Sequence, residues 1–229
     1  MRAVCLLVLA LSALPAWSTD IVDVLVRSQT QRMQQYHPVA ANSERAARVR
    51  ASFEWLVALV EPRRPVELVV VSGPLQAEAM LGKVIVASET LADLPEGERL
   101  LMLAHELGHL SLGHWDDLCA LYRRHIPGEV RPETTDPVAG ALGMEAHRQA
   151  HRHEFEADAF GYRTVHQLGY RLDTVMTLLG RSAAMHDTAS HPGLRKRAAM
   201  LRQLDQEFQT ERVQISASAS WWRAAAVHE

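Results

Sequence analysis

The sequence has little cysteine, no excess of either charge, and no long hydrophobic run after its first residues. Its two cysteines are Cys5, inside the apolar N-terminal run, and Cys119. A single remaining cysteine forms neither an internal disulfide nor a cysteine-based zinc site, so any metal must be held by histidine and carboxylate. With 24 basic and 27 acidic residues the net charge is −3. This balance argues against nucleic acid or an anionic membrane surface as the main partner.

The N-terminus has the features of a secretory signal peptide. Met1-Arg2 precedes an apolar run from Ala3 to Ala16, and Ala16-Trp17-Ser18 offers a small-x-small cleavage site. We therefore predict a signal peptide at residues 1–18, a domain at 19–212 and a C-terminal tail at 213–229, and a periplasmic or secreted location. Retention of the signal as an anchor is the alternative. No later run approaches about 18 apolar residues, so we expect no membrane span in the mature chain.

One apolar stretch without proline, Leu100 to His114, contains the pattern His105-Glu106-Leu-Gly-His109. A helix advances about 100° per residue, which places His105 and His109 one turn apart on one face, within reach of a single metal ion. Glu106 lies at the rim of that face, where it can take a proton from the attacking water. Structural histidines without a metal are the other interpretation, but burying them unpaired costs free energy.

A catalytic zinc usually has three protein ligands, so a third must come from elsewhere. His114 could bind only if the helix broke at Gly113, because on a continuous helix it points away from His105. A role behind the ligands, or in packing, is favoured for His114. The later stretch from His151 to Gly161 offers Glu154 and Asp158 one turn apart on one face, with Glu156 roughly opposite.

A glutamate ligand followed one turn later by an aspartate would supply both the metal contact and the support for a ligand histidine. His147 and His151 continue the same helical face. They leave a second or alternative metal site open, although surface histidines are the favoured interpretation.

Periodicity indicates a predominantly helical α+β fold with a small sheet. Helices are expected on either side of His37-Pro38 and from an N-cap at Asp93. The residues between 126 and 143 form an expected loop, either a cover over a site or a plain crossing. Further helices are expected at 144–168, 173–184 and 194–208, and strands at 66–72 and 83–87.

These motifs together resemble the HtpX-like zinc metallopeptidases, the gluzincin family that includes the CAAX prenyl proteases. The likeness rests on His-Glu-x-x-His, then Glu154-x-x-x-Asp158, then His191-Pro192 followed by Arg197, over roughly residues 66 to 204. It implies a zincin-like domain that binds one Zn²⁺ per chain. It also implies a protein or peptide as substrate.

Carried over residue by residue, the resemblance implies that Glu154 is the third zinc ligand and that Asp158 supports a ligand histidine. His191 would be a catalytic residue near the open metal position, where its imidazole could stabilise an oxyanion or hold the site shut. Arg197 would pair with acidic groups beside the ligands. The segment Gly82, Lys83, Val84, Ile85 looks like the family's glycine turn and substrate-binding edge strand. A purely structural role for these strands stays open.

The sequence therefore predicts an exported zinc endopeptidase acting on misfolded or misassembled envelope proteins, with envelope partner proteins possible. Some members of the family have several spanning helices or a helical-repeat domain, and neither pattern is found here, which leaves prenylated substrates and partner recruitment unsupported. The alternative is a zinc-stabilised binding or chaperone-like module in which His191 closes the metal site.

Overall fold

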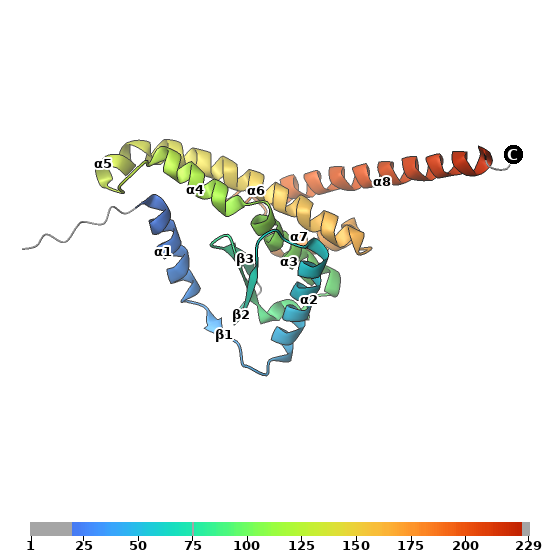
Figure 1. The fold of residues 1–229 in the computed structure, drawn as a ribbon, viewed down its shortest axis with the longest axis horizontal. Coiled ribbons are helices and arrows are strands. Elements are labelled where there is room, and N and C mark those ends of the chain that lie inside the picture. The colour runs from blue at the N-terminus through green and yellow to red at the C-terminus, as the bar shows by residue number, and fades with distance from the viewer. Residues whose placement is uncertain (1–19, 75, 226–229) are drawn as a thin grey trace, which may run out of the picture.

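The computed structural model describes residues 20–74 and 76–225, with side chains given as far as residue 211 except at residue 182. Over this range the chain is mostly helical with one four-stranded sheet, which confirms the predicted fold class (Figure 1). The predicted signal peptide lies outside the described residues. Within them, no helix is both long and apolar enough to cross a membrane.

The first two helices flank the expected turn. Helix α1 (Ile21–Met33) begins at Asp20, whose carboxylate accepts a hydrogen bond from the backbone N–H of Val22. Helix α2 (Glu44–Val60) begins at Ser43 in the same way and ends where Glu61 adopts a left-handed conformation. Between them, the short strand β1 (His37–Pro38) pairs antiparallel with strand β2 (Glu67–Ser72).

The sheet corrects one prediction. Strands β2 (Glu67–Ser72), β3 (Ala77–Met80) and β4 (Val84–Ser88) lie in the order β1-β2-β4-β3. Strand β4 pairs parallel with β2 and antiparallel with β3, so it is an inner strand. Val84 and Ile85 are 3% and 0% exposed. The prediction that this segment is an edge strand is wrong, because both of its edges are already paired. Its role in substrate binding stays a prediction. The edge strand on this side is β3.

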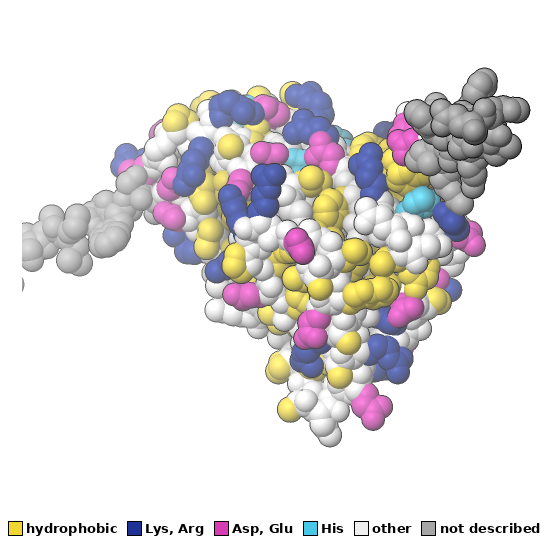
Figure 2. All heavy atoms as spheres, turned by 45° about the vertical axis from the view of Figure 1, so that its right-hand side comes forward, with side chains coloured by type: hydrophobic (Ala, Val, Ile, Leu, Met, Phe, Trp, Pro, Cys, Tyr) yellow, Lys and Arg dark blue, Asp and Glu magenta, His cyan; other side chains and the backbone are white. Residues whose placement is uncertain are grey.

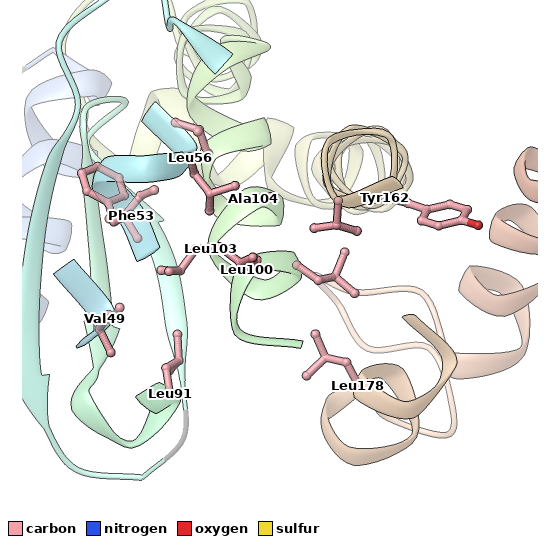
Figure 3. Packing of buried hydrophobic residues seen from close by; sticks show 14 of the residues in the cluster. Val49, Phe53, Leu56, Leu91, Leu100, Leu103, Ala104, Tyr162 and Leu178 are labelled. Carbon is pink, nitrogen blue, oxygen red and sulfur yellow. The ribbon is translucent and has the colours of Figure 1, made fainter. Parts of the chain in front are cut away.

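Helix α3 (Glu96–Ser111), which carries the first motif, lies in the centre of the core. Its buried side chains Leu100, Leu103 and Ala104 pack between α2 and the later helices α6 (Ala139–Gln167) and α7 (Leu172–Ser182) (Figure 3). The expected N-cap at Asp93 is wrong: Asp93 ends the 3-10 helix η1 (Glu89–Asp93) and pairs with Arg45, and α3 begins after Pro95.

The loop expected at 126–143 is largely helical. After α4 (His114–His125) come α5 (Pro132–Thr135), the 3-10 helix η2 (Asp136–Val138) and the long helix α6 (Ala139–Gln167). Val138 and Leu142 pack with Ile21 of α1 and Leu121 of α4. This apolar packing fixes the segment at the far end of the α4–α6 pair (Figure 1), so the predicted cover over the site is wrong.

Two helices complete the fold, α7 (Leu172–Ser182) and α8 (Leu194–Ala225). Helix α8 continues well past the predicted end near Phe208, because no glycine or proline interrupts residues 194–225. Leu201 and Leu204 anchor its first half in the core. On the face shown in Figure 2, hydrophobic, acidic and basic side chains are interspersed, in keeping with the small net charge.

Candidate metal centre

Helix α3 brings the two histidines of the first motif together. The Nε2 atoms of His105 and His109 lie 3.2 Å apart, with the rings close to perpendicular at 74°. Their separation of one helical turn puts both imidazoles on the face of α3 that meets α6. Two nitrogen donors therefore point at one position.

Helix α6 adds a carboxylate to this position. Glu154 Oε2 lies 3.5 Å from His105 Nε2, and Glu154 Oε1 lies 3.3 Å from His109 Nε2. The Glu154 side chain is 8% exposed, and its Oε2 atom is buried without a hydrogen-bond partner. A buried carboxylate oxygen left without a partner costs free energy unless a cation satisfies it. One atom from each residue can therefore hold a metal ion between them.

Asp158 and Arg197 stand behind the ligands. The Nδ1–H of His105 donates to Asp158 Oδ1 at 3.0 Å, which leaves Nε2 free to face the metal position. Arg197 donates to both oxygens of Asp158, from Nε at 2.7 Å and from its terminal nitrogen at 2.5 Å. Burial alone would raise the pKa of Asp158, but Arg197 and His105 hold it below its ordinary value. The structure thus brings both predicted supporting residues to the site.

The charges at the site favour a cation. Burial alone would lower the pKa of His105, but the neighbouring carboxylates of Asp158 and Glu154 outweigh it and raise that pKa to about 10. Burial would likewise raise the pKa of Glu154, yet His105 and His109 hold it well below its ordinary value. A raised imidazole pKa indicates that the electrostatic potential at this position is negative. A metal ion can neutralise the two carboxylates in place of the proton.

Glu106 lies in the same cleft and does not join the ligand cluster. Burial raises its pKa above the ordinary glutamate value, although His105, His109 and the backbone N–H of Ala79 on β3 act to lower it. A carboxylate with a raised pKa next to a metal position suits the acceptance and return of a proton.

His191 reaches the cleft from the loop between α7 and α8. Its Nε2 lies 3.5 Å from Glu154 Oε1, and its Nδ1 lies 2.8 Å from Ser190 Oγ. The loop is tied to α6, because His147 donates to the Ala189 carbonyl at 3.0 Å and His151 donates to the Thr188 carbonyl at 2.9 Å. These two histidines therefore hold the loop and lie outside the metal-ligand groups found among the described residues.

His114 takes the place behind His109 that was favoured for it. The helix does break at Gly113, which has φ +76° and separates α3 from α4. His114 Nδ1 then lies 2.9 Å from His109 Nδ1, on the side of the ring away from Glu154, and His114 Nε2 lies 3.1 Å from Glu156. Glu156, opposite Glu154 on α6, thus belongs to a second group of polar side chains.

The cleft beside the ligands has one polar and one apolar wall. The apolar wall comes from α3 and α7 and comprises Leu101, Met102, Val175, Leu178, Leu179. Gln76 and Ala77, at the start of β3, line the cleft beside Glu106. None of the predicted substrate-binding residues, Gly82, Lys83, Val84 and Ile85, lines it. Gly82 and Lys83 form the turn between β3 and β4, where Gly82 with φ +67° packs against Trp115.

Two contributors to the site were missed in the sequence. Strand β3 has only short alternation, Ala-Glu-Ala-Met, and no β-branched residue, so its sequence gives a weak strand signal. Gly161 lies against the backbone of His105, where a Cβ atom would be 3.1 Å from the His105 nitrogen. An isolated glycine in the middle of a helical pattern was the available sign of this close helix crossing.

Comparisons with known proteins gave a family match and a similar solved structure. The model of peptidase family M48 matches residues 137–205, a segment that includes Glu154, Asp158, His191 and Arg197 and begins after the helix carrying His105 and His109. The crystal structure of S. mikatae Ste24p is similar with a TM-score of 0.51 and 18% sequence identity. The similarity covers 79% of this chain and 56% of that one, so this chain spans little more than half of its length. No curated protein matches the chain.

The family match and the shared fold confirm the resemblance to HtpX-like and CAAX prenyl protease-type metallopeptidases. The family match covers Glu154, Asp158 and Arg197. Helix α3 with the His-Glu-x-x-His motif precedes the matched residues in the chain.

Proposed function

We propose that this chain, with an M48-type match and the fold of Ste24p, is a zinc-dependent endopeptidase that hydrolyses peptide bonds in the cleft between α3 and α6. The observation that carries the proposal is the convergence of His105, His109 and Glu154 on one position, with Glu106 beside it. Two histidines and a glutamate are a ligand set known from catalytic zinc sites, which keep one further position open.

The residues fit one Zn²⁺ at this position. The donors are two imidazole nitrogens and a carboxylate oxygen, and Glu154 Oε2 has no hydrogen-bond partner. When bound, Zn²⁺ would polarise the scissile carbonyl and lower the pKa of the attacking water. Asp158 and Arg197 keep His105 oriented for binding, since they hold its other nitrogen.

Glu106 serves as general base and acid in this proposal. It takes a proton from the water that attacks the peptide carbonyl and passes it to the leaving amine. Its burial raises its pKa, which makes the protonated form accessible during the reaction. His191 faces the same position, and a Ser190 hydroxyl donating to its Nδ1 leaves the Nε2–H free to donate to the developing oxyanion.

The cleft suits an extended peptide with an apolar side chain. Strand β3 pairs with β4 alone among the described strands, and the Ala79 backbone N–H on it hydrogen-bonds to Glu106. The other edge of β3 therefore borders the site and can offer further backbone hydrogen bonds to a substrate. The apolar wall of α3 and α7 lies next to it and can bury a hydrophobic side chain. Unfolded proteins offer both features together. This supports misfolded or misassembled proteins as substrates.

We further propose that the protein works outside the cytoplasm, on envelope proteins, in the periplasm or after secretion. The support is the N-terminal charge, apolar run and small-x-small site in the sequence. Envelope partner proteins that present substrates would fit this location.

Replacing Glu106 by glutamine tests the enzymatic role. Glutamine keeps the size but accepts no proton, so cleavage of a labelled unfolded casein should fall by about 10²–10⁴-fold while the bound zinc stays. The matched control is Glu96→Gln, an exposed glutamate at the start of the same helix, which should cleave at the wild-type rate. A Glu106→Gln variant as active as the wild type would refute the assignment of the base.

A further inference from the structure

A second group of metal-ligating side chains lies on the far side of His109. It is built from two pairs at i, i+3 spacing on facing helices: His114 and Asp117 at the start of α4, and His153 and Glu156 on α6. The pairs meet crosswise. His114 Nε2 lies 3.1 Å from Glu156 Oε2, and His153 Nε2 lies 3.3 Å from Asp117 Oδ2. Each helix therefore presents one imidazole and one carboxylate to the interface between α4 and α6.

The two imidazoles are buried, and one lacks a hydrogen-bond partner. His114 and His153 are 5% and 6% exposed, and their rings stack in parallel with centroids 3.9 Å apart. His153 Nε2 is buried without a hydrogen bond, although it faces the Asp117 carboxylate. The first metal centre has the same feature among the described side chains, since Glu154 Oε2 is also buried without a hydrogen-bond partner. A cation would satisfy such an atom.

The carboxylates of the group face solvent. The side chains of Asp117 and Glu156 are 59% and 45% exposed. Arg152 Nε lies 3.7 Å from Glu156 Oε1, while the other carboxylate oxygen, Oε2, faces His114. An ion can thus enter from the surface between α4 and α6 and reach two buried nitrogen atoms.

Two of the separations match those of a tetrahedral site. Because the rings of His114 and His153 are parallel, one of them must turn before both can point a nitrogen at one ion. Zinc bonds to nitrogen and oxygen of about 2.0–2.1 Å place neighbouring ligand atoms about 3.3–3.4 Å apart. The two measured pairs, at 3.1 and 3.3 Å, are close to this spacing, and the ligand atoms of His114, His153 and Glu156 all lie within 4.8 Å of one another. We propose that these three residues, with Asp117 as a fourth ligand, form a second site for a divalent transition metal such as Zn²⁺.

Metal binding at the second site should affect metal binding at the first centre. This effect, unlike the second site itself, rests on metal binding by His105, His109 and Glu154. A metal on His109 Nε2 requires that ring to carry its proton on Nδ1, where it donates to His114 Nδ1 at 2.9 Å. His114 then carries its own proton on Nε2, toward Glu156. A metal on His114 Nε2 moves that proton to Nδ1, where two N–H groups would face each other. The second ion should therefore bind more weakly once the first is in place.

A Co²⁺ titration of the metal-free full-length protein tests the second site. Binding is followed by the absorption bands of the bound Co²⁺, and a Zn²⁺ titration in competition with a chelator checks the stoichiometry. The wild type should bind two equivalents, the second more weakly. Glu156→Ala, at an exposed position, and His153→Gln should each bind one. Glu145→Ala is the matched control on α6, because its carboxylate pairs with Arg124 and His125 instead, and it should bind two.

Two results would overturn the second site: a wild type that binds one equivalent, or two equivalents retained in both Glu156→Ala and His153→Gln. Circular dichroism of each variant shows that it is folded. Glu154→Ala separates this question from the proposed function, because it should lose the tighter equivalent and keep the other. The stoichiometry is read without any cleavage assay, so failure of the peptidase role would leave this result intact.

Discussion

Each ligand histidine of α3 is held through the ring nitrogen that faces away from the metal position. His105 is fixed by Asp158 at 3.0 Å, and His109 by His114 at 2.9 Å. Such partners set the orientation and tautomer of the ring before an ion arrives. The partners differ in charge, since Asp158 is a carboxylate paired with Arg197 whereas burial, reinforced by His153, lowers the pKa of His114 to about 3. The two ligands are therefore oriented alike by groups of different charge.

His191 gives a prediction at the same scale. If its Nε2–H stabilises the oxyanion, His191→Ala should keep its zinc and lose about 10²–10³-fold in kcat. KM should change much less, because the contact forms mainly in the transition state. Steady-state cleavage of a short fluorogenic peptide separates the two constants. His186→Ala, an exposed histidine in the same loop, serves as the control.

A rise in cleavage on removal of the His191 imidazole would contradict this role. That outcome would favour the binding or chaperone-like alternative, in which His191 occupies the open metal position.

Local spacing was enough to pair most of the site residues that the structure brings together, whereas the roles of Glu154, His191 and Arg197 were predicted from the family resemblance. His105 with His109, and Glu154 with Asp158, are pairs one helical turn apart, and helical geometry alone puts each pair on one face. His114 is different. Its position depends on the left-handed conformation of Gly113, and the sequence permits a continuous helix there as readily as a break. The link between His114 and Glu156 was not predicted, because it needs both the break and the packing of α4 on α6.

The close crossing of α3 and α6 is the feature of the helices that builds the site. Gly161 allows it, since a Cβ atom at this position would lie 3.1 Å from the nitrogen and 3.3 Å from the Cα of His105. Both are backbone atoms, so the helix itself has to move to make room. The positions of Glu154 and Asp158 relative to His105 follow from this approach.

Gly161→Val should push the two helices apart. Overpacking of this kind costs typically about 1–3 kcal/mol, and we expect a lower free energy of unfolding together with weaker zinc binding. Denaturant unfolding of the metal-free protein and a zinc titration measure the two effects. In Gly143→Val, on the same helix, the added Cβ has no neighbour within 4 Å, so zinc affinity should stay at the wild-type value. Equal zinc affinities in the two variants would show that the crossing does not set the site.

The sheet shows where prediction from sequence stopped. The β-branched segments were recognised as strands, but the order in which strands pair depends on contacts between distant residues. The apolar run of β4 fits an inner strand, buried at every position. The weaker strand β3 lies at the edge and borders the cleft. The edge-strand role was therefore assigned to the wrong strand, although the sheet itself was predicted.

At the scale of the whole molecule, one centre collects side chains from α3, α6, the loop before α8 and α8 itself. The large core cluster holds these elements together, with residues from α2, α3, α6, α7 and α8 in contact. The ligands are consequently brought together by the complete fold. The fold is shared with Ste24p over little more than half of that protein's length, and the described part of this chain contains all three proposed ligands.

An anomalous difference map at the zinc absorption edge, from crystals of the full-length protein grown with zinc, examines this arrangement directly. We predict a peak about 2.0–2.2 Å from the Nε2 atoms of His105 and His109 and from a carboxylate oxygen of Glu154. In crystals of Glu154→Ala this peak should be lost or much reduced. A zinc-loaded protein whose map shows no peak between these three side chains would contradict the metal centre, and with it the peptidase function.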